Sequence, residues 1–363
     1  MPRSTGSLRR LAAGVVLVSS VLASTAGVGV AAQPAGHTRA MTKVSIVLKW
    51  VTQAQFAGYF VALKKGYYAK EGLDVTIQPG GPDILPEQVV EKGTATFGLD
   101  WLPSLLIQRE HGQDLVNIAQ FYQTTGMRLI TYKTSGIKSP KDFKGKKIGV
   151  WQFGNQYQFL AWMAKLGYNP DKDMTVIHQG FEMNTFLAHK MDLASAMTYN
   201  ELGVVLESGV KMSQLNVFDY GQAGVSMLED GLYARGDYLK AHPDVAVKFL
   251  KASILGWQDV VKDPAGAAQI VVDADQSGQA KLAHQAYMAK EVVKLLWWGH
   301  AKTYGIGYMD PAAYQRTVKQ ALQFGVIKKT PSGAYTQTYW KQAIAALAKD
   351  KSLMLDMSGM KGM

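Results

Sequence analysis

The hydrophobic pattern over residues 43–81 predicts a strand, a helix and a second strand in close succession. Apolar residues largely alternate with polar ones over 43–48, as in a half-buried strand. Apolar residues at helical spacing follow over 56–63, and Gly66 ends this helix. A second alternating run over 73–77 is closed by a proline–glycine–glycine turn. This is the strand–helix–strand unit of an open parallel sheet.

Similar strand–helix units repeat through the middle of the chain. Further strands are predicted at 96–99, 115–121, 127–132, 147–150, 175–178, 193–197 and 231–234. Helices between them are predicted at 101–111, 156–166 and 185–189. After Pro243 the pattern is almost wholly helical, with helices at 245–263, 264–275, 281–296, 311–324 and 338–350. Strands that alternate with helices indicate an α/β protein.

The order of these elements predicts two α/β lobes, each a mostly parallel sheet flanked by helices. We place the first lobe at 43–133 and 225–350, and the second lobe at 134–224. The strand around 127–133 and the segment around 224–233 are expected to cross between the lobes. Two crossings of this kind form a hinge, which allows the lobes to close over a ligand.

Residues 1–32 have the pattern of a secretory signal peptide. Three arginines precede an apolar run rich in Ala, Val and Ser, and 30–32 offers a small-residue cleavage site. Because the apolar run is long, an uncleaved membrane anchor is the alternative. The chain has no cysteine, which excludes a lipoprotein anchored through an acylated cysteine. We therefore expect an exported, periplasmic or otherwise extracytoplasmic protein, with a loose tail at 351–363.

The composition is that of a globular protein with an excess of basic residues. The 363 residues are 47% hydrophobic, and their formal net charge is +11. The lysines are scattered, and their densest group, at 141–147, lies in a loop before a strand. We therefore expect no nucleic-acid binding. Attraction to an anionic membrane surface or partner is the milder interpretation.

The motifs of common catalytic and metal sites are missing from the sequence. The seven histidines are scattered and form no H-x-x-x-H pair. The glycine turn at 80–83 has neither the ending of a phosphate loop nor the spacing of a dinucleotide-binding loop. We therefore expect no catalytic residues, no metal and no cofactor.

Aromatic and polar side chains gather where the predicted strands end. Ligands of open α/β sheets bind at this edge, where loops meet helix N-termini. The predicted ligand-binding residues of the first lobe are Trp50, Gln53, Tyr59, Asp83, Asp100 and Trp101. Those of the second lobe are Trp151, Asn155, Tyr157, Glu182, Asn184, Tyr199 and Glu201. These are groups for stacking and hydrogen bonding, so they predict a site that binds rather than reacts.

Several of these residues have a structural alternative. Tyr59 shares its helical phase with core positions, and Trp50 could pack at the rim of the core. Asp83 and Asn155 could each cap the helix that follows. Glu201 could equally be a solvated or capping acid.

Four segments resemble one protein family. They are the K-W…F-A-G-Y…K-G-Y-Y…E-G-L-D-V block over 49–75, G-x-x-x-F-G over 93–98, S-P-K-D-F-K-G-K-K-I-G-V over 139–150 and M-T-Y-N-E over 197–201. The family is that of ABC-importer solute-binding proteins related to the thiamine-pyrimidine-precursor and sulfonate binders. It also contains riboflavin binders, nitrate-like anion binders and fungal pyrimidine synthases. The likeness covers about 43–345.

The resemblance implies a fold, partners and a role for one residue. The fold would be the two-lobed, type II-like periplasmic-binding-protein fold with a hinge of two crossing strands. The partners would be a small-molecule ligand, an ABC permease and its ATPase. Glu201 is similar to the family's carboxylate that accepts from an exocyclic amine or a ring N–H.

The chain departs from the synthase branch of the family. The synthases keep a lysine and a histidine at the positions that hold Asp100 and Ser104 here, together with a cysteine-rich metal motif. A Schiff base with pyridoxal phosphate requires an amine, which Asp100 does not supply. The resemblance therefore implies a binding protein rather than an enzyme.

The candidate residues also indicate a ligand class. Aromatic residues from both lobes, with amides and carboxylates but no convergent arginine, suit a neutral or weakly basic planar heterocycle. Sulfonates or nitrate would require cationic side chains. The number of aromatic residues favours riboflavin, and a thiamine pyrimidine precursor is the alternative. A pyrimidine-synthase enzyme is the second alternative.

Overall fold

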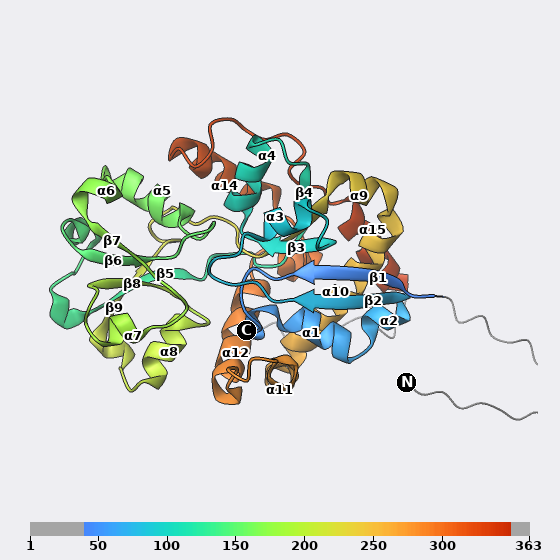
Figure 1. Cartoon of the computed structure of the whole chain (residues 1–363), viewed down its shortest axis with the longest axis horizontal. Helices are drawn as coiled ribbons and strands as arrows, with labels where there is room; N and C mark the ends of the chain where they lie inside the picture. The colour runs from blue at the N-terminus through green and yellow to red at the C-terminus, as the bar shows by residue number, and fades with distance from the viewer. Residues whose placement is uncertain (1–39, 350–363) are drawn as a thin grey trace, which may run out of the picture. The chain divides into compact units, whose positions relative to one another are not determined.

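The structure is a computed structural model that describes residues 40–349 (Figure 1). The predicted signal peptide and the predicted loose tail lie outside the described residues. Within these bounds, no helix combines the length and the apolar composition that a membrane crossing requires.

Two five-stranded sheets form the framework. The first has the order β2-β1-β3-β10-β4, with bounds β1 Thr42–Val47, β2 Leu73–Gln78, β3 Phe97–Asp100, β4 Leu115–Gln120 and β10 Gly231–Arg235. The second has the order β7-β6-β8-β5-β9, with bounds β5 Met127–Tyr132, β6 Lys147–Val150, β7 Thr175–His178, β8 Leu193–Met197 and β9 Leu215–Asp219. The predicted two-lobed α/β fold is confirmed, and β9 is a strand that the sequence pattern missed.

Both sheets are mixed. In the first, β1 runs parallel to β2 and β3, whereas β10 runs antiparallel to β3 and β4. In the second, β6 runs parallel to β7 and β8, whereas β5 runs antiparallel to β8 and β9. In each sheet, the antiparallel strand is therefore the first one that the chain forms after it crosses from the other lobe.

The strand at 127–132 does not itself cross between the sheets. It pairs with β8 and β9 and is mostly buried, so its backbone groups are satisfied inside the second sheet. The chain crosses just before it, over 121–126, and again over 220–230. We therefore propose that β5 belongs to the second lobe and that the other lobe boundaries are those predicted from the sequence.

Helices flank both sheets, and most of the predicted ones are present. Those grouped with the first sheet are α1 Ala57–Lys64, α2 Tyr67–Lys70, α3 Pro86–Glu91, α4 Leu102–Glu110, α9 Gly236–Ala241, α10 Pro243–Lys262, α11 Pro264–Ala274, α12 Leu282–Leu296, α13 Ala301–Tyr304, α14 Pro311–Gln323 and α15 Thr338–Lys349. Those grouped with the second are α5 Tyr157–Leu166, α6 Pro170–Asp173, α7 Asn184–Leu187 and α8 Glu201–Glu207. Prolines at the first turn start α10, α11 and α14, where a missing N–H costs nothing.

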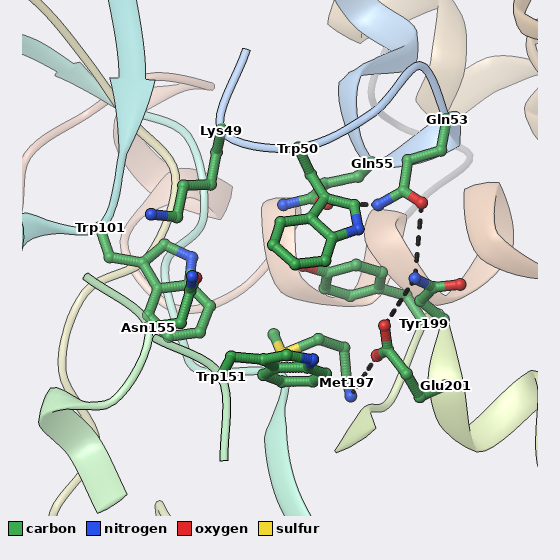
Figure 2. A pocket seen from close by; sticks show the side chains of 11 residues that line it. Lys49, Trp50, Gln53, Gln55, Trp101, Trp151, Asn155, Met197, Tyr199 and Glu201 are labelled. Atoms are coloured by element: carbon green, nitrogen blue, oxygen red, sulfur yellow. Dashed lines mark hydrogen bonds between the residues drawn. The ribbon is translucent and has the colours of Figure 1, made fainter. Parts of the chain in front are cut away.

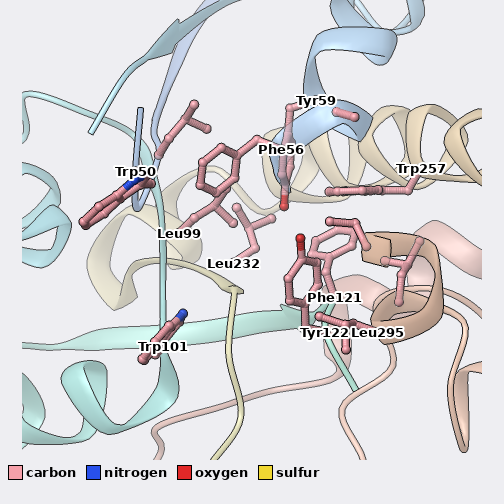
Figure 3. Packing of buried hydrophobic residues seen from close by; sticks show 14 of the residues in the cluster. Trp50, Phe56, Tyr59, Leu99, Trp101, Phe121, Tyr122, Leu232, Trp257 and Leu295 are labelled. Atoms are coloured by element: carbon pink, nitrogen blue, oxygen red, sulfur yellow. The ribbon is translucent and has the colours of Figure 1, made fainter. Parts of the chain in front are cut away.

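The core of the first lobe depends on close contact between α1 and α10. A Cβ on Gly256 would lie 2.0 Å from the carbonyl oxygen of Gly58, and a Cβ on Gly58 would lie 2.2 Å from the Trp257 ring. Because both positions are glycine, Trp257 can pack edge-on to Tyr59, with ring centroids 5.8 Å apart, and against Phe121 (Figure 3). The side chain of Tyr59 is therefore a core side chain.

Candidate ligand-binding site

A cavity lies where strands of both sheets end (Figure 2). Its lining residues follow β1, β3, β6 and β8, and they are Lys49, Trp50, Gln53, Gln55, Trp101, Trp151, Asn155, Met197, Tyr199, Asn200 and Glu201. The cavity between them has a volume of about 20 Å³. That is room for about one water molecule. In this arrangement the cavity is too small for a ring ligand.

Tryptophans from both lobes form the walls of the cavity. Trp50 and Trp151 meet edge to face, with ring centroids 6.3 Å apart and planes at 66°. Trp151 is fixed by its indole N–H, which donates to the carbonyl oxygen of Gly180 at 2.9 Å. Trp101 and Tyr199 are also buried beside the cavity. A planar ligand can stack on these faces once the lobes separate enough to part Trp50 from Trp151.

A buried ion pair lies beside these walls. Lys49 Nζ is 2.8 Å from Asp100 Oδ1, and both side chains are almost fully buried. The same ammonium donates to the carbonyl oxygen of Phe153, at 3.1 Å, which joins the first lobe to the loop after β6. Gly154 has a φ of +94°, and a Cβ there would lie 3.2 Å from Lys49 Nζ. This glycine therefore allows the loop to approach the ammonium.

Asp230 accepts hydrogen bonds from two of the residues that line the cavity. Its Oδ1 accepts from the indole N–H of Trp101 at 3.1 Å, and its Oδ2 accepts from Gln55 Nε2 at 2.7 Å. Gln55 Oε1 in turn accepts from Gln53 Nε2 at 2.6 Å. Burial raises the pKa of Asp230 to about 7, although the bond from Gln55 opposes the shift. The two glutamines thus present fixed amide edges to the cavity.

A second set of bonds joins the lobes through Asn200. Its Nδ2 donates to Glu201 Oε1 at 2.8 Å and to Gln53 Oε1 at 3.4 Å. Its Oδ1 lies 2.9 Å from His284 Nε2, while His284 Nδ1 lies 3.0 Å from a carboxylate oxygen of Glu207. Asn200 and His284 thereby link the second lobe to α12 of the first lobe.

Burial raises the pKa of Glu201 from 4.5 to about 7, against the bonds donated by Met197 N–H and Asn200. Between these two values the unfolded carboxyl has lost its proton and the folded one has kept it, so stability falls as the pH rises. Each tenfold difference in proton affinity corresponds to about 1.4 kcal/mol.

We expect Glu201→Gln to remove this penalty. Relative to the wild type, its free energy of unfolding should rise by about 3 kcal/mol between pH 4.5 and 7.5. Urea unfolding at several pH values measures the difference, and Glu182→Gln, on the exposed surface, is the matched control. Parallel pH profiles for Glu201→Gln and the wild type would show that Glu201 does not hold its proton in the folded state.

The structure brings together seven of the predicted site residues and separates six from the cavity wall. Trp50, Gln53, Trp101, Trp151, Asn155, Tyr199 and Glu201 line the cavity. Asp83, Glu182 and Asn184 are exposed, and Tyr157 is half-buried outside the lining. Asp100 lies behind Lys49 and neutralises it.

Four lining residues were not predicted, and each left a weak signal. Lys49 is a polar residue at the end of a buried strand. Gln55 is two residues beyond a predicted contact, Met197 ends a predicted strand, and Asn200 lies between Tyr199 and Glu201. Within residues 40–349, no three His, Asp or Glu side chains are grouped as a metal site would need.

A family model described as NMT1/THI5 like matches residues 53–267. The chain belongs to the NMT1/THI5-like family. Family membership agrees with the resemblance in the sequence motifs.

Both binding proteins and enzymes are among the relatives in this family. The chain is 26% identical to riboflavin-binding protein RibY of Chloroflexus aurantiacus, over 85% of this chain and 91% of that protein. It is 24% identical to the formylaminopyrimidine-binding protein of Halalkalibacterium halodurans, over 66% of this chain and 72% of that protein. It is 27% identical to the 4-amino-5-hydroxymethyl-2-methylpyrimidine phosphate synthase of Schizosaccharomyces pombe, over 61% of this chain and 66% of that protein.

Solved structures share the fold at lower identity. The periplasmic nitrate-binding protein NrtA from Synechocystis PCC 6803 superposes with a TM-score of 0.67 at 14% identity. The match covers 87% of this chain and 91% of that one. The likeness establishes the two-lobed periplasmic-binding-protein architecture.

Proposed function

We propose that this chain is the extracytoplasmic solute-binding component of an ABC importer and that it captures a flat, uncharged heteroaromatic, riboflavin first. The observation that carries the proposal is the cavity between the lobes, whose walls are Trp50, Trp101, Trp151 and Tyr199. The likeness to a riboflavin-binding protein over 91% of that protein's length supports it. The ligand would pass from the cavity to an ABC permease, driven by the permease's ATPase.

The electrostatics of the cavity favour a neutral ligand over an anion. Among the described residues, no arginine lines it, and the charge of Lys49 is balanced by Asp100. Glu201 adds a carboxyl that can accept from a ring N–H or donate to a ring nitrogen, because its pKa lies at about 7. A sulfonate or nitrate ion would find no unpaired cationic side chain in the cavity, and it would lie close to the carboxyl of Glu201.

A thiamine pyrimidine precursor is the second candidate ligand. The small volume of the cavity favours a single ring, since less separation of Trp50 and Trp151 would admit it. The likeness to a formylaminopyrimidine-binding protein supports the same ligand class. The two candidates share the aromatic walls and differ in how far the lobes must open.

Catalysis of the synthase type is a poorer fit to the cavity. An amine does line it, that of Lys49, but it is almost fully buried, forms an ion pair with Asp100 and donates to the Phe153 carbonyl. Schiff-base formation needs a neutral, accessible amine. We therefore propose binding without turnover.

Purification of the exported chain, followed by a visible absorbance scan and mass spectrometry of the released ligand, tests the proposal. We expect a yellow protein that releases unchanged riboflavin. A colourless protein that gives binding heat with aminopyrimidines would replace riboflavin by the second candidate. Turnover of either compound would contradict the proposal of a binding protein.

A further inference from the structure

A second hollow adjoins the cavity on the far side of Gln53 and Asn200. These two residues and Trp50 line both spaces. The outer hollow has a volume of about 690 Å³, compared with about 20 Å³ for the cavity. Residues of both lobes line it, and Phe181 and Gln276 among them are exposed. We call it the outer groove.

The partition between the two spaces is thin and joins opposite lobes. It is the contact between Gln53 Oε1 and Asn200 Nδ2, which at 3.4 Å is longer than the other bonds that these two amides make. Because Gln53 follows β1 and Asn200 follows β8, separation of the lobes would break this contact together with the bond between Asn200 and His284. A ligand larger than the cavity can therefore extend past these two amides.

The chemistry of the outer groove differs from that of the cavity. Its walls include Thr52, Gln276 and Gln279, and no hydrogen bond among residues 40–349 uses these three side chains. Amides and hydroxyls both donate and accept, as the hydroxyl groups of a ligand require. Phe181, which is 43% exposed, adds apolar surface.

The charges in the outer groove are unfavourable for a phosphate. None of the described residues that line it is a lysine or an arginine, and Asp275 is an acid among them. His284 also lines the groove, but its two ring nitrogens are already used by Asn200 and Glu207. A phosphate there would lie near the Asp275 carboxylate without gaining a cationic partner.

We infer that the outer groove is a second subsite, which takes a neutral, hydroxylated tail attached to the ring bound in the cavity and discriminates against a phosphorylated tail. This inference rests on the proposed function, and it deepens it. It specifies a ring-plus-tail ligand such as riboflavin over both the bare ring and the phosphate ester.

Three flavins and one blocking variant test the inference. Calorimetry compares lumiflavin, which has no hydroxylated tail, with riboflavin and with riboflavin 5′-phosphate. We expect riboflavin to bind at least about tenfold more tightly than either, because several hydrogen bonds to the tail are gained or lost together. Ala280→Trp, at the half-buried rim of the outer groove, should lower riboflavin affinity to that of lumiflavin and leave lumiflavin binding unchanged.

Ala345→Trp, on an exposed face of α15, is the matched control and should change neither affinity. Equal affinities for riboflavin and lumiflavin in the wild type would overturn the subsite while leaving the proposed function intact. An equal loss of both ligands in Ala280→Trp would overturn it as well. Failure of all three flavins to bind the folded protein would overturn both the riboflavin proposal and this inference.

Discussion

Lys49→Met should lower the free energy of unfolding by about 3–5 kcal/mol, the usual cost of leaving a buried charge without its partner. The Asp100 carboxylate would remain buried without Lys49. It would also face Glu87, whose pKa is already raised by burial and by the charge of Asp100. Urea unfolding followed by circular dichroism measures the loss.

An exposed ion pair provides the control for this prediction. Lys65 lies 2.8 Å from Asp259, the same distance as the buried pair, but 46% of the Lys65 side chain is exposed. Lys65→Met should therefore cost less than about 1 kcal/mol. The double variant Lys49→Met/Asp100→Asn should recover much of the stability, because it removes both charges. Equal losses for Lys49→Met and Lys65→Met would show that the buried pair has no special role.

Trp151→Ala should raise the dissociation constant of the ring ligand by about thirtyfold or more, the effect of removing a central aromatic anchor from a binding site. The change removes one wall of the cavity and its contact with Trp50. Trp151→Phe retains a ring and should fall between the alanine variant and the wild type. Calorimetric titration of the folded variants measures the effect.

The control is Trp298→Ala. This tryptophan is 57% exposed and lies outside the cavity lining, so its removal should leave the affinity unchanged. If Trp151→Ala binds the ligand as tightly as Trp298→Ala does, the cavity is not the place where the ring stacks.

Strand-end reasoning predicted more than half of the cavity lining, and physical causes explain the rest. Trp50, Trp101 and Trp151 each follow a strand that periodicity identifies, so topology alone brings them to one edge. Tyr59 shares its periodicity with the core, and only the close contact of Gly58 with Trp257 shows that its side chain packs inward. Helical phase does not distinguish a face towards the core from a face towards a cleft.

The residues that sequence reasoning missed depend on distant partners. Lys49 is buried only because Asp100, 51 residues later, neutralises it. Asn200 reaches the cavity because Glu201 and His284 hold its amide from two directions. Similarly, the strand at 127–132 was expected to be a crossing because pairing with the later strands β8 and β9 leaves no local signal.

Titration of the purified protein with riboflavin, followed by quenching of flavin fluorescence, shows whether the flavin ring stacks in the cavity. A flavin stacked on the tryptophans of the cavity should be quenched saturably at one ligand per chain, with a dissociation constant in the micromolar range or below, on the order expected for a vitamin-sized ligand between aromatic walls. The same titration of folded Trp151→Ala should show little quenching. Absence of quenching and of binding heat with the folded wild-type protein would show that the chain does not bind riboflavin.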